Sequence, residues 1–354
     1  MDATNGAGCS RFRRKSGSAG HGRGDLGDYR ACDLYGALDL GTNNCRLLIA
    51  TPIDNGFTVV DAFSRIVRLG EWQGRTGRLH DQAMARTVEA LRVCANKLKW
   101  RNVTKTRLVA TEACRTATNG AEFVARVASE TGLRLEIIDR ETEAALAATG
   151  AEPLIDRAAE TALVFDIGGG STEVMWMART GERFGIAAWT SLAAGVVTIS
   201  ELFGGGVDVT PQSFVAMREY LRPMVMEFRD RVSRITGGMT VPTHLLGTSG
   251  TVTTIAGVQL GLTRYDRSKV DGSWLSSADI GRVTHDLLHM NYSERAANPC
   301  IGRERADLVL AGCAILEEIR LAFPAERIRV ADRGLREGIL TMLMKQDGTY
   351  GRPA

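Results

Sequence analysis

The sequence predicts an α/β protein in which two similar domains face each other across a cleft. The chain has 354 residues, which suggests two domains at about 100–200 residues each. Strand-like apolar runs alternate with helical patterns, and this alternation indicates sheets covered by helices. One strand-turn-strand unit occurs twice, at Asp39 and again at Asp166, which suggests a duplicated domain with a ligand site between the copies.

The first copy of this unit begins with an apolar strand that ends at Asp39. A polar turn follows over 41–44. Further strands are expected over 47–50 and 57–63, and residues 54–56 read Asp-Asn-Gly, a sequence that favours a hairpin turn. The pattern therefore predicts three strands in succession, joined by two turns.

The second copy repeats the first in residue type and spacing. Asp166 takes the position of Asp39, and Gly168 takes that of Gly41. Two more strands follow with a turn between them near Gly181, as in the first copy. The repeat is far longer than the unit of a solenoid, so it indicates duplication of a whole domain.

The remaining elements follow from apolar spacing. Apolar residues three and four apart predict a helix, and short β-rich runs between turn residues predict strands. The helices expected in this way span 81–100, 121–132, 141–150, 211–235, 251–258, 277–290, 305–323 and 334–343. The strands span 107–110, 133–138, 172–177, 184–190, 244–250 with its turn, and 327–330.

The first 30 residues differ in composition from the rest of the chain. They carry six basic and three acidic residues, which accounts for the whole net charge of +3, so the rest of the chain sums to zero. Much Gly, Ser and Arg with few apolar residues predicts a disordered basic arm, placed at residues 1–35, that could tether a polyanion. The balanced charge of the body argues against a nucleic-acid-binding surface.

Other features exclude whole classes of protein. No apolar run approaches the roughly 20 residues that span a bilayer, and no apolar core follows the basic start as in a signal peptide. The seven cysteines are odd in number and include no C-x-x-C pair, so neither a disulfide framework nor a zinc site is expected. We therefore expect a protein of the reducing cytoplasm without a membrane partner.

Three turns rich in glycine and hydroxyl residues each follow an apolar strand, at 41–43, 168–172 and 247–250. Glycine lets backbone amides converge on an anion, hydroxyl groups add donors, and an aspartate at the strand end can hold Mg²⁺ or its waters. Together they predict a phosphate-binding cleft. The P-loop, the dinucleotide fingerprint and the G-x-S-x-G elbow are not found, which argues against those three classes.

The sequence around Asp39 and the run 166–173 resemble the phosphate loops of the sugar kinase, Hsp70 and actin superfamily. Further motifs occur in order: Thr-Glu-Ala-Cys-Arg-Thr-Ala-Thr-Asn at 111–119, Ile-Ile at 137–138 leading to Glu143, Gly-Thr-Ser-Gly-Thr at 247–251, and Arg-Gly-Leu-Arg-Glu-Gly at 333–338. As an ordered set over residues 36–345, they resemble the exopolyphosphatase and guanosine pentaphosphate phosphohydrolase (Ppx/GppA) family, in a short two-domain form.

The resemblance implies a duplicated actin-like, RNase H-like fold with the active site in the interdomain cleft. Residues 36–141 together with 325–345 would form the first domain, and 142–324 the second. The implied reaction is hydrolysis of a terminal phosphoanhydride with Mg²⁺, or with Mn²⁺ in its place. The resemblance also implies a homodimer.

Residue roles are carried over by motif. Glu143 matches the catalytic general base, and Glu173 matches a catalytic acid that also binds metal. Asp166 matches a metal ligand, Asp39 is the third metal candidate, and Arg115 matches the arginine that grips phosphate. The remaining candidates for substrate and phosphate binding are Thr42, Asn43, Arg46, Gly168, Gly169, Gly170, Ser171, Thr172, Gly247, Thr248, Ser249 and Gly250.

Two positions depart from the family pattern. Asn44 stands where Ser is common. Thr142 replaces the first member of a frequent Glu-Glu pair, whose second, catalytic member is retained as Glu143. We expect hydrolysis to be preserved, with weaker ordering of metal or water.

The expected function is that of an exopolyphosphatase, which releases orthophosphate from the end of inorganic polyphosphate. Hydrolysis of guanosine pentaphosphate (pppGpp) to tetraphosphate is the alternative, because it breaks the same kind of bond and the sequence holds no guanine motif. An ATP-dependent kinase would share the phosphate loops, and a non-catalytic alarmone sensor would account for Thr142. No specific nucleic acid is expected as a partner.

Overall fold

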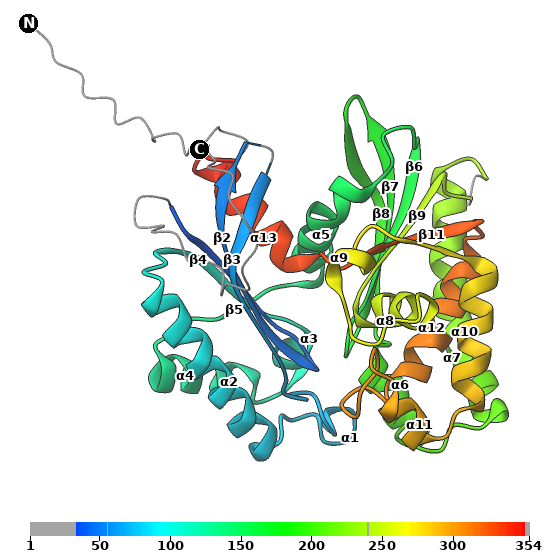
Figure 1. Ribbon diagram of the computed structural model, residues 1–354, viewed down its shortest axis with the longest axis horizontal. Helices are drawn as coiled ribbons and strands as arrows, with labels where there is room; N and C mark the ends of the chain where they lie inside the picture. Colours follow the sequence, from blue (N-terminus) through cyan, green and yellow to red (C-terminus); the bar gives the residue numbers. More distant parts are fainter. Residues whose placement is uncertain (1–32, 55, 239–240, 351–354) are drawn as a thin grey trace, which may run out of the picture.

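The computed structural model describes residues 33–54, 56–238 and 241–350, which form two lobes side by side (Figure 1). The basic arm expected over 1–35 lies outside the described residues except at its end. There Tyr35 is a buried residue of the first strand, which corrects that boundary. Among the described residues, no helix is both long and apolar enough to cross a membrane.

The first lobe is built on a five-stranded sheet with the order β3-β2-β1-β4-β5. Strands β1 (Tyr35–Leu40), β2 (Asn44–Ile53) and β3 (Gly56–Ile66) form an antiparallel meander. Strands β4 (Lys105–Ala110) and β5 (Glu136–Ile137) add to β1 in parallel. Parallel strands need crossover connections, and helices between them supply these.

Helices cover both faces of the first sheet. Successive strand residues point to opposite faces, so Leu38 and Leu40 belong to one core while Tyr35 and Ala37 belong to another. The first core packs against α2 (Asp81–Trp100), α3 (Glu112–Thr116) and α4 (Gly120–Thr131), and α1 (Gln73–Thr76) precedes them. The second core packs against α13 (Leu335–Gln346), near the end of the chain.

The second lobe repeats this plan with a six-stranded sheet, β10-β11-β9-β6-β7-β8. Its β8-β7-β6 meander is antiparallel and β9 and β11 extend it in parallel, as β4 and β5 do in the first lobe. The fold is therefore the duplicated actin-like fold that the sequence predicted. The strands are β6 (Thr161–Ile167), β7 (Thr172–Thr180), β8 (Arg183–Leu192), β9 (His244–Thr248), β10 (Trp274–Ser276) and β11 (Arg327–Ala331).

Helices also sandwich the second sheet. The large core of this lobe lies between the sheet and the long α7, α10 and α12, while α5 and a short 3₁₀ turn cover the other face. The helices of this lobe are α5 (Arg140–Ala151), η2 (Glu152–Leu154), α6 (Val196–Leu202), α7 (Pro211–Ile235), α8 (Gly250–Gln259), α9 (Arg267–Val270), α10 (Ser277–His289), α11 (Tyr292–Ala297) and α12 (Val309–Ala322).

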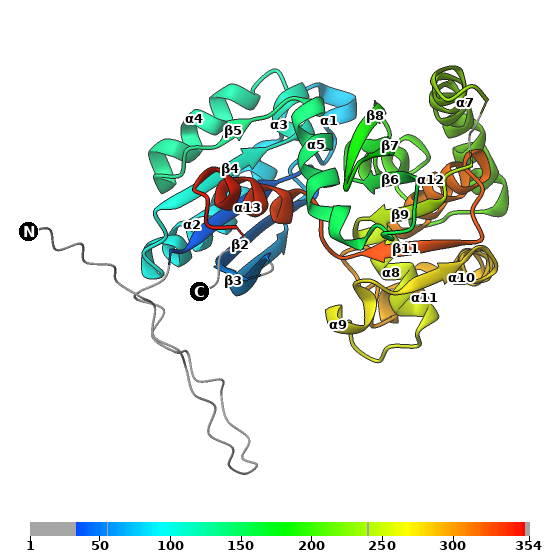
Figure 2. The same cartoon turned by 90° about the horizontal axis from the view of Figure 1, so that it is seen from above.

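The two lobes meet through α5 and α13, which lie against each other between the sheets (Figure 2). Two glycines make this contact possible. A Cβ atom on Gly150 would lie 1.9 Å from the carbonyl oxygen of Gly334, and one on Gly338 would lie 1.9 Å from that of Leu146. Any larger residue would therefore push the two backbones apart. The chain passes between the lobes at these two helices.

The structure corrects three expectations about the elements. Residues 325–345 were all expected in the first domain, but β11 pairs in parallel with β9 of the second sheet, and only α13 returns to the first. The helix expected over 305–323 begins at Val309, because residues 305–308 form a loop. The strand expected over 133–138 is reduced to β5.

Candidate active site

A small cavity of about 120 Å³ lies between the lobes at the carboxyl ends of β1 and β6. Open α/β sheets commonly bind their ligands at this edge. The duplicated turns 41–44 and 168–171 form part of its wall, and the start of α5 closes it. The sequence-predicted Asp39, Glu143, Asp166 and Glu173 all line it.

The first turn presents polar side chains that have no partner. It is closed by a hydrogen bond of 2.9 Å from the Gly41 backbone nitrogen to the Asn44 carbonyl oxygen. Thr42 Oγ1, Asn43 Oδ1 and Asn44 Oδ1 are buried and form no hydrogen bond with the described residues. Buried polar atoms are normally satisfied, so this turn has the unmet bonding capacity expected of a ligand site.

The second turn is nearly free of side chains and lies directly against the first. The Gly168 backbone nitrogen donates to the Ser171 carbonyl oxygen at 2.9 Å, as in the first turn. A Cβ atom on Gly170 would lie 2.6 Å from Thr42 Oγ1, and one on Gly169 would lie 3.1 Å from the Asn43 nitrogen. Glycine is required here because the two turns approach so closely.

Five carboxylates line this cavity, and four of them were predicted from the sequence. Asp39 and Asp166 occupy equivalent positions near the ends of β1 and β6. Glu173 is buried on β7, where its Oε1 accepts hydrogen bonds of 2.8 Å from the hydroxyls of Ser171 and Ser191. Glu143 lies in the first turn of α5, which Asp139 caps by accepting from the Thr142 nitrogen at 2.7 Å.

The environment of the four predicted carboxylates favours their protonated forms. Burial raises the pKa of Asp39 and Asp166. Burial and the neighbouring Asp166 raise the pKa of Glu173 to about 7, against the hydrogen bonds from the two serines. Burial and the neighbouring Glu173 raise the pKa of Glu143 well above its usual range. A cation or a positively charged group would relieve this repulsion.

The donor chemistry suits a divalent cation with few protein ligands. Carboxylate oxygens are hard ligands, which Mg²⁺ and Mn²⁺ prefer. Within the described part of the chain, however, no three Asp, Glu, His or Cys side chains are placed to hold one ion. The expected trio Asp39, Asp166 and Glu173 is therefore not a closed metal cage. Mg²⁺ typically takes one or two carboxylates and completes its shell with substrate phosphates and water.

Arg115, expected to grip phosphate, is instead bound to carboxylates. Its Nη1 donates to Glu143 Oε2 at 3.0 Å and to the Ile138 carbonyl oxygen at 2.7 Å, and its Nη2 donates to Glu112 Oε2 at 2.5 Å. Arg140 holds the other oxygen of Glu112 at 2.8 Å. The side chain of Arg115 is thus positioned to orient Glu143, and it does not line the cavity. Glu112 lines it and was not predicted as a site residue.

The third turn contributes only in part. Ser249 and Gly250 line the cavity, and Ser249 has a φ of 123°, an unusual value for a residue with a side chain. Its hydroxyl caps α8 by accepting from the Thr251 nitrogen at 3.2 Å. Gly247, however, is a residue of β9 whose Cβ would lie 2.6 Å from the Phe165 ring, so it is required for packing.

Two further predicted phosphate ligands have structural partners. The Thr172 hydroxyl donates to the Ala194 carbonyl oxygen at 2.6 Å and lies outside the cavity lining. Thr248 forms a side-chain hydrogen bond with Asp166, which lowers the pKa of that carboxyl against the effect of burial. Thr248 lines the wider chamber that adjoins this cavity, whereas Gly247 and Thr172 line neither space.

The small cavity continues into a wider chamber of about 780 Å³. Asp39, Arg46, Asp166 and Arg305 line both spaces, so they mark the passage between them. The chamber is rich in arginine. The arginines that line it are Arg46, Arg65, Arg267, Arg303, Arg305, Arg333 and Arg336.

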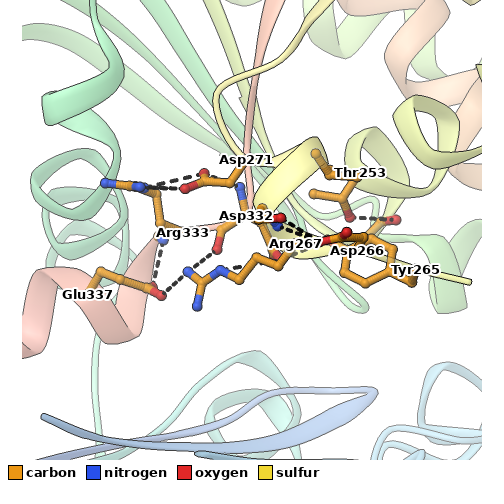
Figure 3. A network of polar contacts seen from close by, with 12 residues as sticks. Thr253, Tyr265, Asp266, Arg267, Asp271, Asp332, Arg333 and Glu337 are labelled. Atoms are coloured by element: carbon orange, nitrogen blue, oxygen red, sulfur yellow. Dashed lines mark hydrogen bonds and ion pairs between the residues drawn. The ribbon is translucent and has the colours of Figure 1, made fainter. Parts of the chain in front are cut away.

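Two of these arginines are neutralised by a network at the crossing from β11 to α13 (Figure 3). Arg267 Nη2 donates to Glu337 Oε1 at 3.0 Å, and Arg333 Nε donates to Asp271 Oδ2 at 3.1 Å. Tyr265 donates to Asp332 Oδ2 at 2.7 Å in the same network. The network fixes this part of the chamber wall. Its acidic side chains, Asp271, Asp332 and Glu337, are paired with donors of the same network.

The guanidinium groups of the other five arginines have no such partners among the described residues. No side-chain hydrogen bond or ion pair joins a described residue to the guanidinium group of Arg46, Arg65, Arg303, Arg305 or Arg336. Burial lowers the pKa of Arg305 and of Arg336. Partnerless guanidinium groups in a cleft favour a multiply charged anion. Arg305 and Arg336 were not predicted as site residues, because only the fold brings them to Arg46.

Comparisons with known proteins agree on one family. A model of the Ppx/GppA phosphatase family matches residues 48–347. The protein named Exopolyphosphatase 2 of Mycobacterium tuberculosis is 31% identical over 325 residues, which cover 87% of this chain and 97% of that protein. The match therefore includes both lobes of the chain.

Solved structures show the same architecture. The crystal structure of the Aquifex aeolicus member of the Ppx/GppA family is 27% identical with a TM-score of 0.73, covering 89% of this chain and 99% of that chain. An exopolyphosphatase from Cytophaga hutchinsonii is 24% identical with a TM-score of 0.80, covering 89% and 98%. At that identity the second comparison establishes the shared fold alone.

Proposed function

The chain belongs to the Ppx/GppA phosphatase family, and we propose that within it the chain is an exopolyphosphatase. It would hydrolyse the terminal phosphoanhydride of inorganic polyphosphate and release orthophosphate. The observation that carries this proposal is the passage from a carboxylate-lined cavity into a chamber with partnerless arginines. The relative named Exopolyphosphatase 2 supports the same substrate.

The two spaces suit the two parts of a polyphosphate chain. The terminal phosphate would occupy the small cavity, where the turns 41–44 and 168–171 offer backbone amides and hydroxyls. The following phosphates would lie in the chamber against Arg46, Arg305 and Arg336. A run of negative charges is matched by a run of positive groups, which is the electrostatic complementarity that selects a polyanion.

Glu143 is the proposed general base for the attacking water. The raised pKa of its carboxylate makes it a stronger base than an exposed glutamate. The bond from Arg115 Nη1 fixes the orientation of Oε2 and leaves Oε1 to accept the proton of the water. The arginines and backbone amides would stabilise the charge on the transferring phosphoryl group, which carries most of the catalysis in this type of reaction.

We also propose Mg²⁺, or Mn²⁺, as the cofactor, held by Asp166 and Glu173 with Asp39 as the third candidate. The ion would neutralise charge on the phosphoryl oxygens. The protein's own part is to hold Asp166 and Glu173 close together, where a cation would take the place of the protons that burial favours. The hydroxyls of Ser171 and Ser191 favour the ionised form of Glu173.

Glu143→Gln tests the catalytic assignment. It should lower kcat by about 10²–10⁴-fold while polyphosphate binding persists, because only proton transfer is lost. Glu141→Gln is the matched control, since Glu141 is an exposed residue of the same helical turn and should leave kcat within about twofold. If Glu143→Gln keeps more than about a tenth of the wild-type kcat, the base is another group.

The substrate is tested by phosphate release from long-chain polyphosphate, guanosine pentaphosphate and ATP at equal concentrations. We expect the highest kcat/KM with polyphosphate, because only a long chain occupies the arginine chamber along its length. A higher kcat/KM with guanosine pentaphosphate would replace the proposed substrate while keeping the proposed chemistry. Phosphate transfer from ATP to a sugar or an acid, without net hydrolysis, would reject the hydrolase assignment.

A further inference from the structure

A short segment of the first lobe supports the first phosphate turn from behind. The backbone nitrogens of Val67 and Arg68 both donate to the Asn43 carbonyl oxygen, at 2.9 and 3.1 Å, and the Gly70 nitrogen donates to the Thr42 carbonyl oxygen at 2.9 Å. Arg68 has a φ of 48°, in the left-handed region that residues with side chains rarely adopt. Such backbone conformations persist where surrounding contacts enforce them and are frequent at functional sites.

The side chain of Arg68 crosses from this segment to the second lobe. Its Nη1 donates to Asp307 Oδ2 at 2.7 Å and its Nη2 to Asp307 Oδ1 at 2.9 Å. The same Nη2 also donates to the Glu304 carbonyl oxygen at 3.1 Å. This is a two-pronged pairing between guanidinium and carboxylate, the strongest geometry that such a pair can adopt.

The contacts of Arg68 enclose a residue of the substrate chamber. Arg305 lies between Glu304 and Asp307 in sequence and lines both cavities, and its guanidinium group forms no hydrogen bond or ion pair with a described residue. The Asp307 carbonyl oxygen is held in addition by the Ser200 hydroxyl at 2.9 Å. The loop that presents Arg305 is therefore anchored from its own lobe by Ser200 and from the other lobe by Arg68.

We propose that Arg68 is a positioning residue for substrate binding, and that it acts through Asp307 without touching the substrate. By joining the back of the first phosphate turn to the loop 304–307, it fixes Arg305 opposite Thr42 and Asn43. Arg68 itself lines neither cavity. The proposal rests on the proposed function, since it assigns Arg305 to a phosphate of the bound polyphosphate chain.

The position of this ion pair separates the proposal from simple stabilisation. The side chain of Arg68 is 31% exposed and that of Asp307 is 14% exposed, so the pair is partly screened by water. Partly exposed pairs contribute modestly to folding stability. An effect on substrate binding larger than the effect on stability is thus the signature of a positioning role.

The test uses the full chain with long-chain polyphosphate as substrate. Arg68→Gln should raise KM about tenfold with kcat within about twofold, because Arg305 loses its fixed position while Glu143 is undisturbed. The KM of Arg68→Lys should lie between those of wild type and Arg68→Gln, because an ammonium group keeps the positive charge but cannot form the two-pronged pairing. The exchange Arg68→Glu with Asp307→Arg should restore KM to within about threefold of wild type, since it rebuilds the ion pair in reverse.

Arg92→Gln is the matched control. It removes the same charge and breaks a 2.7 Å ion pair to Glu130, but that pair joins α2 and α4 within the first lobe. We expect its KM to be unchanged. An unchanged KM in Arg68→Gln, or a reversed pair that fails to recover, would overturn the proposal.

Hydrogen exchange gives a readout that does not depend on activity. Without the cross-lobe bond, amide exchange in Arg68→Gln should be faster in two segments on different lobes, 41–46 and 304–309. Arg92→Gln should leave both segments at the wild-type rate. A wild-type chain inactive on polyphosphate would refute the proposed function and leave this prediction standing. Faster exchange in neither segment, or in 41–46 alone, would overturn the bridge itself.

Discussion

The two copies of the strand-turn-strand unit carry opposite charges at one pair of equivalent positions. In the first lobe Asp39 on β1 lies opposite Arg46 on β2, whereas in the second lobe Asp166 on β6 lies opposite Glu173 on β7. The same backbone register thus places a cation beside one aspartate and an anion beside the other. Duplication gives both lobes the same backbone geometry. The difference in charge gives each lobe a different role in the site.

The turns follow the same division. The first turn carries three buried polar side-chain atoms without partners, while the second has glycines and a serine whose hydroxyl is already given to Glu173. The first lobe is therefore built to receive the oxygens of an anion. The second lobe is built to hold a negative charge that must be balanced by a metal ion or a proton.

Glu173→Gln would remove the negative charge that distinguishes the second lobe, and it should have the largest effect. We expect kcat to fall about 100-fold or more and the Mg²⁺ concentration for half-maximal activity to rise, with KM changed little. Ser191→Ala removes one hydrogen bond to the same carboxylate and serves as the milder control. A magnesium titration and a kcat that both match wild type would contradict the assignment to metal and acid chemistry.

Arg46→Gln makes the complementary change in the first lobe. One lost charged contact costs about 1.5–3 kcal/mol, so kcat/KM should fall about ten- to a hundredfold, through KM. The midpoint of the magnesium titration should stay in place. Steady-state kinetics on polyphosphate at several magnesium concentrations measure both quantities. If Arg46→Gln shifts the midpoint of the magnesium titration as Glu173→Gln does, the two lobes do not have separate roles.

Local sequence predicted much of the fold. Helices α2 and α7 begin and end where apolar periodicity placed them, because a polar cap or Pro at the start and a long apolar stripe are local signals. The duplicated aspartates were likewise visible from spacing. The assignment of β11 was not, because its parallel partner β9 is about 80 residues earlier in the chain and pairing leaves no local mark.

The site was predictable to a similar degree. The turn residues and the carboxylates lie beside strand ends, so their sequence motifs predict where they lie in the fold. The partners of Arg115 and the meeting of Arg46 with Arg305 and Arg336 depend on contacts between distant segments. A motif assigns a residue type to a turn, but it does not state which charge that residue faces. The contacts of Arg115 with Glu112 and Glu143 could not be predicted for this reason.

Gly41→Ala and Gly168→Ala compare the two turns at equivalent positions. Both glycines donate to a carbonyl three residues later at 2.9 Å, but a Cβ on Gly41 would have its nearest contact at 3.6 Å and one on Gly168 at 2.9 Å from the Ser171 carbonyl oxygen. Gly168→Ala should lower the free energy of unfolding by about 1–3 kcal/mol and reduce kcat/KM, because backbone must move. Gly41→Ala should change the free energy of unfolding by less than about 0.5 kcal/mol. Equal effects in denaturant unfolding would show that the turns are equally tight.

Arg115→Gln asks whether the arginine between the lobes serves the base or the substrate, and its effect should be the smallest. Glu143 acts as a base only when it is ionised, and the positive charge of Arg115 lowers the pKa of Glu143 against the upward effect of burial and of Glu173. Removing that charge raises the pKa further, so the acid limb of the kcat/KM profile should move to higher pH.

The shape of the pH profile separates the two roles of Arg115. If Arg115 serves Glu143, the Gln variant should approach the wild-type kcat/KM to within about threefold at alkaline pH, where Glu143 is ionised in both proteins. Arg115→Lys keeps the charge near Glu143 and should move the acid limb less. If Arg115 instead gripped phosphate, kcat/KM would be depressed by a similar factor at every pH, because a guanidinium remains charged throughout the range. A uniform loss without a shift of the acid limb would therefore return Arg115 to the substrate and leave Glu143 held by α5 alone.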